Sequence, residues 1–78
     1  MGKEVYKLLS EYSRRCLEIY GNYNDQIDQY KQLRAEVLSS FEKEFKEENE
    51  DIMCLIDAID RRIQRCLQML EVERKYNI

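Results

Sequence analysis

Hydrophobic residues recur along the whole chain at alternating spacings of three and four, the pattern of amphipathic helices that pack along one stripe. No stretch sustains the alternation of apolar and polar residues that is typical of a strand. Three stripes can be followed: Val5, Leu9, Tyr12, Cys16, Ile19 and Tyr23; then Ile27, Tyr30, Val37, Phe41 and Phe45, widened by Leu33 and Leu38; then Ile52, Ile56, Ile59, Ile63, Cys66 and Leu70, flanked by Leu55 and Leu67. The pattern predicts helices near residues 3–20, 25–46 and 50–76.

The first break between helices is marked by Gly21 and Asn22. Glycine ends helices because it adopts the left-handed conformation without a Cβ penalty. Asn24 then offers a side-chain oxygen that can cap the next helix, and Asp25 suits the positive end of its dipole. We therefore expect the second helix to begin near residue 25.

The second break, within residues 46–51, contains neither glycine nor proline. Asn49 can cap a new helix whose first turn carries Glu50 and Asp51. The alternative is one helix over residues 25–76, about 78 Å long, which has no partner of matching length in its own chain and would have to dimerise. We favour the turn, and so an all-α, small antiparallel three-helix bundle that forms a single domain over residues 1–78. The expected core is Leu9, Tyr12, Cys16, Ile19, Tyr30, Val37, Phe41, Ile56, Ile59, Ile63 and Leu70.

Composition excludes much of catalytic chemistry. The 78 residues contain no histidine, proline or tryptophan, and the formal net charge is −3. Without histidine there is no imidazole base and no common nitrogen ligand for a transition metal. The paired carboxylates lie in charge-dense segments, where nothing indicates a pocket that would shift a pKa. We expect no enzymatic activity, no cofactor and no metal.

The three cysteines, Cys16, Cys54 and Cys66, are odd in number and lack metal-site spacing. Cys16 and Cys66 fall on apolar stripes, whereas Cys54 points away from the stripe of its helix. Neither a secretory signal nor an apolar run of membrane-spanning length is present. Free thiols in a cytoplasmic protein, away from membranes, are therefore the expectation.

Arg34 interrupts the stripe formed by Tyr30, Val37 and Phe41. A charge there must reach solvent or pair with a carboxylate. Glu11 or Glu18 of the first helix is the expected partner. The functional alternative is that Arg34 meets an external ligand in a groove.

The broadest apolar face belongs to the first helix, where Tyr6, Leu17 and Tyr20 extend beyond the stripe. Met53 and Met69 flank the stripe of the third helix. Exposed tyrosine, leucine and methionine are typical of protein-binding surfaces. We therefore name Tyr6, Leu17, Tyr20, Arg34, Met53 and Met69 as candidate partner-binding residues. A wide core face that touches two neighbouring helices would explain the same pattern.

Nucleic-acid binding is not expected, although Arg61, Arg62 and Arg65 cluster on one helix. Phosphate binding needs a coherent positive patch. Here acidic residues are interleaved with the arginines, as in a solvated, salt-bridged face.

The segment from Tyr30 to Leu38, Tyr-Lys-Gln-Leu-Arg-Ala-Glu-Val-Leu, looks like the Arg-x-x-(Leu/Val)-Leu segment in a middle helix of bacterial flagellar export chaperones of the FliT and FlgN type. The helix from Asp51 to Glu73 could correspond to a later amphipathic helix of that family. This resemblance implies a small cytoplasmic chaperone that holds its substrates by helix-to-helix contacts. It singles out no binding residue.

Three functional hypotheses follow. The leading one is a non-enzymatic helical interaction module, such as an adaptor, chaperone or small inhibitor, that binds another protein through its apolar helix face. The second is a self-assembling structural dimer, and the third is a small regulator that touches nucleic acid through the arginine-rich face.

Overall fold

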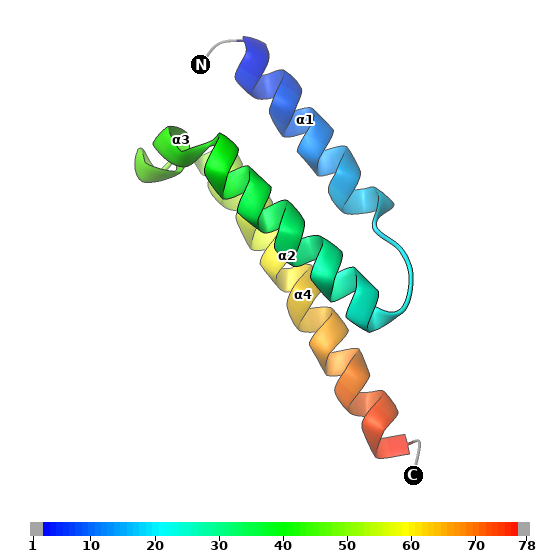
Figure 1. The fold of residues 1–78 in the computed structure, drawn as a ribbon. Coiled ribbons are helices and arrows are strands. Elements are labelled where there is room, and N and C mark those ends of the chain that lie inside the picture. The colour runs from blue at the N-terminus through cyan, green and yellow to red at the C-terminus, as the bar shows by residue number, and fades with distance from the viewer. Residues whose placement is uncertain (1–2, 77–78) are drawn as a thin grey trace.

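The computed structural model describes residues 3–76, which form α1 (Lys3–Glu18), α2 (Tyr23–Ser40), the short α3 (Glu42–Lys46) and α4 (Glu50–Tyr76). The all-α class is confirmed, and no strand occurs within this range. Helices α1 and α4 run in the same direction and α2 runs in the opposite one (Figure 1). The bundle measures 52 × 21 × 15 Å, and its radius of gyration of 14.4 Å exceeds the roughly 11.5 Å of a compact chain of this length. The molecule is therefore elongated.

The antiparallel pair α2–α4 contains most of the core. The five largest fully buried side chains are Leu33, Val37, Phe41, Ile52 and Ile59, and none of them belongs to α1. Two hydrogen bonds between the helices define the register of the pair: Arg34 Nε donates to Asp60 Oδ1 at 2.7 Å, and Cys66 Sγ donates to Gln26 Oε1 at 3.6 Å. No charged or polar residue is buried within residues 4–76, so this interior is apolar apart from the tyrosine and cysteine groups.

The turn between α3 and α4 confirms the break expected within residues 46–51. Glu48 adopts a left-handed conformation with φ of +56°. The amide N–H of Glu48 bonds to the carbonyl of Phe45 and that of Asn49 to the carbonyl of Glu44, which is the hydrogen-bond pattern of a Schellman cap. The side chain of Asn49 then accepts from the amides of Asp51 and Ile52 and caps α4. The alternative of one helix over residues 25–76 is wrong.

The second helix is interrupted earlier than the sequence predicts. At Phe41 the backbone leaves helical geometry, with φ of −118° and ψ of +33°, and α3 follows as a separate helix. Hydrogen bonds from Phe41 to Val37 and from Phe45 to Phe41 cross the distortion, so the chain bends without opening into a loop. Phe41 is buried and packs edge-on against Tyr12, with ring centroids 5.8 Å apart. Beyond the bend Phe45 is exposed, although it continues the sequence stripe.

The first break lies where Gly21 predicts it, but its cap differs. Gly21 has φ of +114°, a conformation that favours glycine. α1 ends at Glu18, and α2 begins at Tyr23 rather than near residue 25. The cap is Asn22, whose Oδ1 accepts from the amide of Asp25 at 2.8 Å; the prediction of Asn24 is wrong. Because the backbone of Asn22 is already extended, its side chain can cap α2 two residues earlier than Asn24 would.

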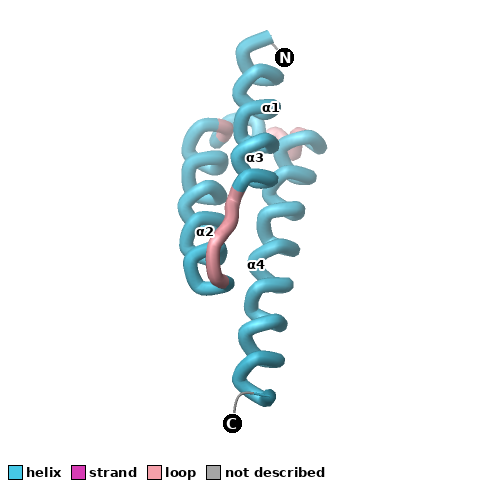
Figure 2. The backbone as a smooth tube through the Cα atoms, turned by 90° about the vertical axis from the view of Figure 1, so that its right-hand side faces the viewer, coloured by secondary structure: helices cyan, strands magenta, loops and turns pink. Residues whose placement is uncertain are grey.

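Helix α1 is displaced lengthwise along α2. A hairpin closed in the shortest way by residues 19–22 would place Arg15 opposite Gln26. Instead Arg15 donates to Glu36, ten residues further along α2, at 2.6 Å. Ten residues correspond to about 15 Å of helix, and the five backbone steps from Glu18 to Tyr23 can span about 16–18 Å when extended. Figure 2 shows this connection running along the length of the bundle.

The displacement explains which core predictions fail. Most of the expected core residues are buried, including Tyr12 and Cys16 of α1, while Leu9, Ile19 and Leu70 are only partly buried. Leu9 lies near the middle of α1 and lines the open groove toward α4, Ile19 lies just after the last residue of α1, and Leu70 lies on the part of α4 that α1 does not reach. The core also takes in Ile27, Leu33, Ile52, Leu55 and Cys66.

We predict that Phe41→Ala or Ile59→Ala lowers the free energy of unfolding by about 2–5 kcal/mol, because each leaves a cavity in the α2–α4 core. Urea denaturation followed by circular dichroism measures the change. The milder Ile59→Val should cost about 0.5–1.5 kcal/mol and keeps the test usable if the alanine variants do not fold. The exposed Leu67→Ala is the control and should change stability by less than about 0.5 kcal/mol. Equal effects at positions 59 and 67 would contradict the core assignment.

Glu48→Gly should stabilise the protein by about 0.5–1 kcal/mol. It removes a left-handed conformation that costs an L-residue about 1–2 kcal/mol, and the greater freedom of glycine in the unfolded chain offsets part of the gain. Glu47→Gly is the matched control: Glu47 has φ of −81°, so glycine there should destabilise. Thermal unfolding compares the two, and a loss of stability in both would argue against this turn.

Candidate functional site

An apolar groove separates α1 from α4. Its volume is about 340 Å³, and it is open to solvent along one side. The lining from α1 is Leu9, Ser13, Cys16 and Leu17, and the lining from α4 is Asp51, Cys54, Leu55, Ala58 and Arg62. Leu17 is 70% exposed. We call this the α1–α4 groove.

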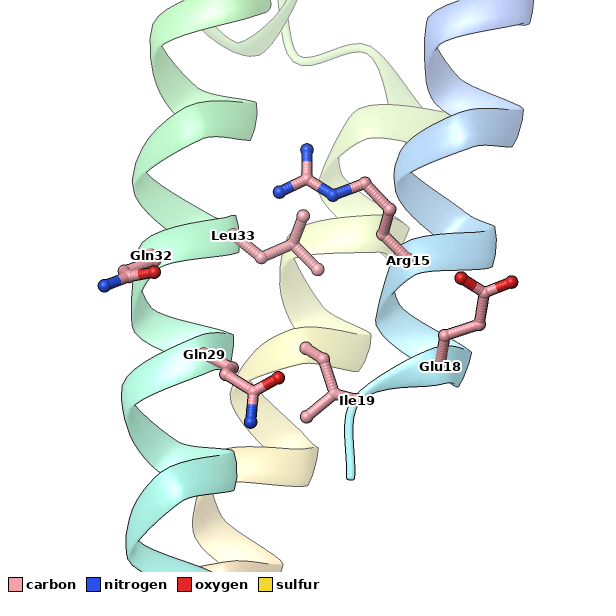
Figure 3. A pocket seen from close by; sticks show the side chains of 6 residues that line it. All are labelled: Arg15, Glu18, Ile19, Gln29, Gln32 and Leu33. Atoms are coloured by element: carbon pink, nitrogen blue, oxygen red, sulfur yellow. The ribbon is translucent and has the colours of Figure 1, made fainter. Parts of the chain in front are cut away.

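The opposite flank of α1 is closed by polar contacts. Figure 3 shows Ile19 and Leu33 pointing into the space between α1 and α2, while Gln32 points away from it. Arg15 crosses this space to Glu36, and the hydroxyl groups of Tyr12 and Ser40 bond at 2.8 Å. The hydrogen bond with Glu36 raises the pKa of Arg15. These contacts fasten α1 to α2 and leave less room for a partner than the other flank does.

A larger groove of about 790 Å³ lies between α2 and α4 and is lined by three arginines. Its α2 wall is Tyr23, Gln26 and Tyr30, and its α4 wall is Cys54, Asp57, Ala58, Arg61, Arg62, Arg65 and Cys66. We call it the arginine groove. It shares Cys54, Ala58 and Arg62 with the α1–α4 groove, so the two grooves adjoin along α4.

The structure brings only some of the sequence-predicted residues together. Leu17 lines the α1–α4 groove, and Tyr6 is exposed on the same flank of α1, eleven residues earlier. Tyr20 lies two residues beyond α1 and is 81% exposed. Met53 and Met69 are exposed on α4, but sixteen residues of helix turn them almost half a turn apart. Met53 therefore faces away from the side on which Met69 lies.

The sequence predicted that Arg34 pairs with Glu11 or Glu18 of the first helix, and this prediction is wrong. The partner of Arg34 is Asp60 of α4, because Arg34 lies on the side of α2 that faces α4. Both side chains are more than a third exposed, so solvent screens the pair, which contributes at most about 1 kcal/mol. Arg34 is therefore engaged within the bundle.

Sequence reasoning missed Leu55, Ala58 and Arg62 as groove residues. A second line runs along α4 at spacings of 4, 3, 4, 3 and 4, parallel to the buried stripe: Asp51, Leu55, Ala58, Arg62, Arg65 and Met69. Its mixed composition hides it from a search for hydrophobic periodicity. A search for small and cationic residues at the same spacing would have found it.

The cysteines divide as predicted: Cys16 and Cys66 are buried and Cys54 is exposed. Burial raises the pKa of Cys16 and of Cys66, and the nearby Arg62 and Arg65 respectively offset part of that shift. Within residues 3–76 no three His, Cys, Asp or Glu side chains are grouped so as to hold a metal ion. No helix in the same range has the length and apolar character needed to cross a membrane.

Comparisons with protein-family models, curated proteins and solved structures found no match. The resemblance to flagellar export chaperones stays a prediction from residues 30–38 and 51–73.

We predict that Cys54 alone reacts rapidly with Ellman's reagent in the folded protein. Cys16 and Cys66 are shielded, and their raised pKa leaves less thiolate near neutral pH. The measurement compares the thiols that react quickly in buffer with those that react in denaturant. Cys16 reacting as fast as Cys54 would contradict the packing of α1, because α1 is the helix that carries Cys16.

Proposed function

We propose that the chain is a non-enzymatic helical interaction module, an adaptor, chaperone or small inhibitor, that holds an amphipathic helix of another protein in the α1–α4 groove. The observation that carries this proposal is the apolar lining of an open groove by Leu9, Leu17, Leu55 and Ala58. A helix recognised in this way presents apolar side chains at i, i+3, i+4 and i+7.

The light attachment of α1 supports the proposal. Among residues 4–18 of α1 only Tyr12 and Cys16 are buried, and Leu17 is 70% exposed, so the intramolecular core does not use Leu17. Leucine and tyrosine on such a flank offer a large apolar area with little rotamer entropy to lose. Ala58 on the facing wall lets another backbone approach α4 closely.

Self-assembly through the same groove is the second candidate from the sequence. The form of it that depended on a 52-residue helix loses its basis, because the chain turns at Glu48. A second copy could still place a helix in the α1–α4 groove, and a small domain gains much by burying additional area. The oligomeric state in solution therefore belongs to the test.

The test uses the tagged protein as bait in its native cell extract, with mass spectrometry and sedimentation in parallel. Proteins captured by the wild type should be lost when Tyr6, Leu17 and Tyr20 are all replaced by serine. This removes Leu17 from the lining of the groove, Tyr6 from the same face of α1, and the exposed Tyr20 just after α1. Helicity should be retained, since all three are exposed.

The matched control replaces Leu8, Leu67 and Tyr76 by serine. These residues are also large, apolar and exposed, but they line neither groove. This variant should capture the same proteins as the wild type. Capture that survives the first triple change would contradict the proposed site, and a concentration-dependent dimer that this change abolishes would favour self-assembly.

A further inference from the structure

The displacement of α1 leaves part of the α2–α4 pair without a third helix. Glu18, the last residue of α1, and the following Ile19 line the same pocket as Gln29, Gln32 and Leu33 of α2. Only the first six residues of α2, 23–28, therefore extend past the end of α1, and the extended connection runs alongside them (Figure 2). Gln26 and Gln29 hold this connection against α2 by donating to the carbonyls of Gly21 and Tyr20. The α4 side of the same region stays open and forms the arginine groove.

The charges of the arginine groove are unbalanced. Asp57 is the only carboxylate among its lining residues, and it already pairs with Arg61 at 3.0 Å. Arg62 and Arg65 have no hydrogen bond or ion pair with any residue in 3–76. The groove therefore has two uncommitted cations above a floor that includes Tyr30, Ala58 and Cys66, although the whole chain is acidic.

We propose that the helix bound in the α1–α4 groove continues into the arginine groove and places carboxylates beside Arg62 and Arg65. This rests on the proposed function and adds to it the charge and length of the partner. The residues of α4 that line the two grooves run from Asp51 to Cys66, a helix length of about 22 Å, so the bound helix has roughly fifteen residues. Its apolar stripe lies against Leu17, Leu55 and Ala58, and one end carries Glu or Asp.

Charge complementarity favours an acidic protein segment over a nucleic acid. Guanidinium groups bind carboxylates in a fixed, forked geometry, and two such groups one turn apart match two carboxylates one turn apart on a helix. Nucleic acid would need a longer run of cations, because its affinity comes from the number of phosphates neutralised. Here Asp57 lies within the groove, and Asp51 lines the α1–α4 groove.

The test uses synthetic helical peptides of about fifteen residues with one fixed leucine stripe. Two carry a pair of glutamates, in the first or in the last two turns, and a third has glutamine at all those positions. Binding is followed by fluorescence anisotropy and by protection of Cys54 from alkylation, since Cys54 lines both grooves and is the exposed cysteine. One glutamate peptide should bind about tenfold more tightly than the glutamine peptide, and high salt should reduce the difference.

Arg62→Glu with Arg65→Glu should abolish this preference. Lys7→Glu with Lys31→Glu changes the net charge equally at exposed positions outside both grooves and should preserve it. Equal binding of all three peptides would overturn the inference while leaving helix binding intact. Failure of every peptide to bind would overturn the inference, and the bait experiment would then judge the proposed function separately. Preference for a DNA or RNA duplex, lost in the Arg62/Arg65 variant, would also overturn it.

Discussion

The antiparallel packing of α2 against α4 is the interaction on which the rest of the molecule depends. The side chains with almost no solvent exposure lie in these two helices or, for Phe41, directly after α2. Helix α1 adds two buried residues to this pair and is fastened by exposed polar contacts at Arg15 and by the hydroxyl bond of Tyr12. Exposed ion pairs contribute little. Losing the α2–α4 core would therefore remove the surface on which α1 packs, whereas loosening α1 leaves that core its main contacts.

The register of α2 against α4 follows from the position of the turn between them. The sequence therefore allows this register to be predicted from the turn as well as from the hydrophobic stripes. A hairpin that folds about residues 46–47 places Arg34 opposite Asp60, and Gln26 close to Cys66, as observed. The prediction that Arg34 pairs with a carboxylate of the first helix did not take this hairpin register into account. The register of α1 could not be obtained in the same way, because a four-residue connection can be compact or extended. The sequence thus predicts the helices and most of their buried faces, but not the lengthwise position of α1.

Local backbone geometry accounts for the remaining differences. Asn22 and Asn24 have the same capping chemistry, and which of them caps depends on the conformation imposed by Gly21. No glycine or proline near Phe41 predicts the distortion there. The distortion accompanies burial of the Phe41 ring against Tyr12, which lies 29 residues earlier in the sequence. The residues of the candidate site were the hardest to predict, because they depend on the lengthwise position of α1. Leu17 is recognisable from the sequence because it is apolar. Ala58 and Arg62 can be identified as groove residues only when the position of α1 along α4 is known.

The composition of the second line on α4 changes along its length. Beside α1 the line carries Leu55, Ala58 and Arg62, and Arg65 follows outside the lining of the α1–α4 groove. Arginine suits both states of an open groove. When the groove is empty, the long side chains cover apolar floor while their charges remain in water. When a helix enters, the same charges cost less to bury against carboxylates than against apolar groups, because an unpaired charge loses its hydration without compensation. The residues that keep this surface soluble are thus the ones that would select an acidic partner.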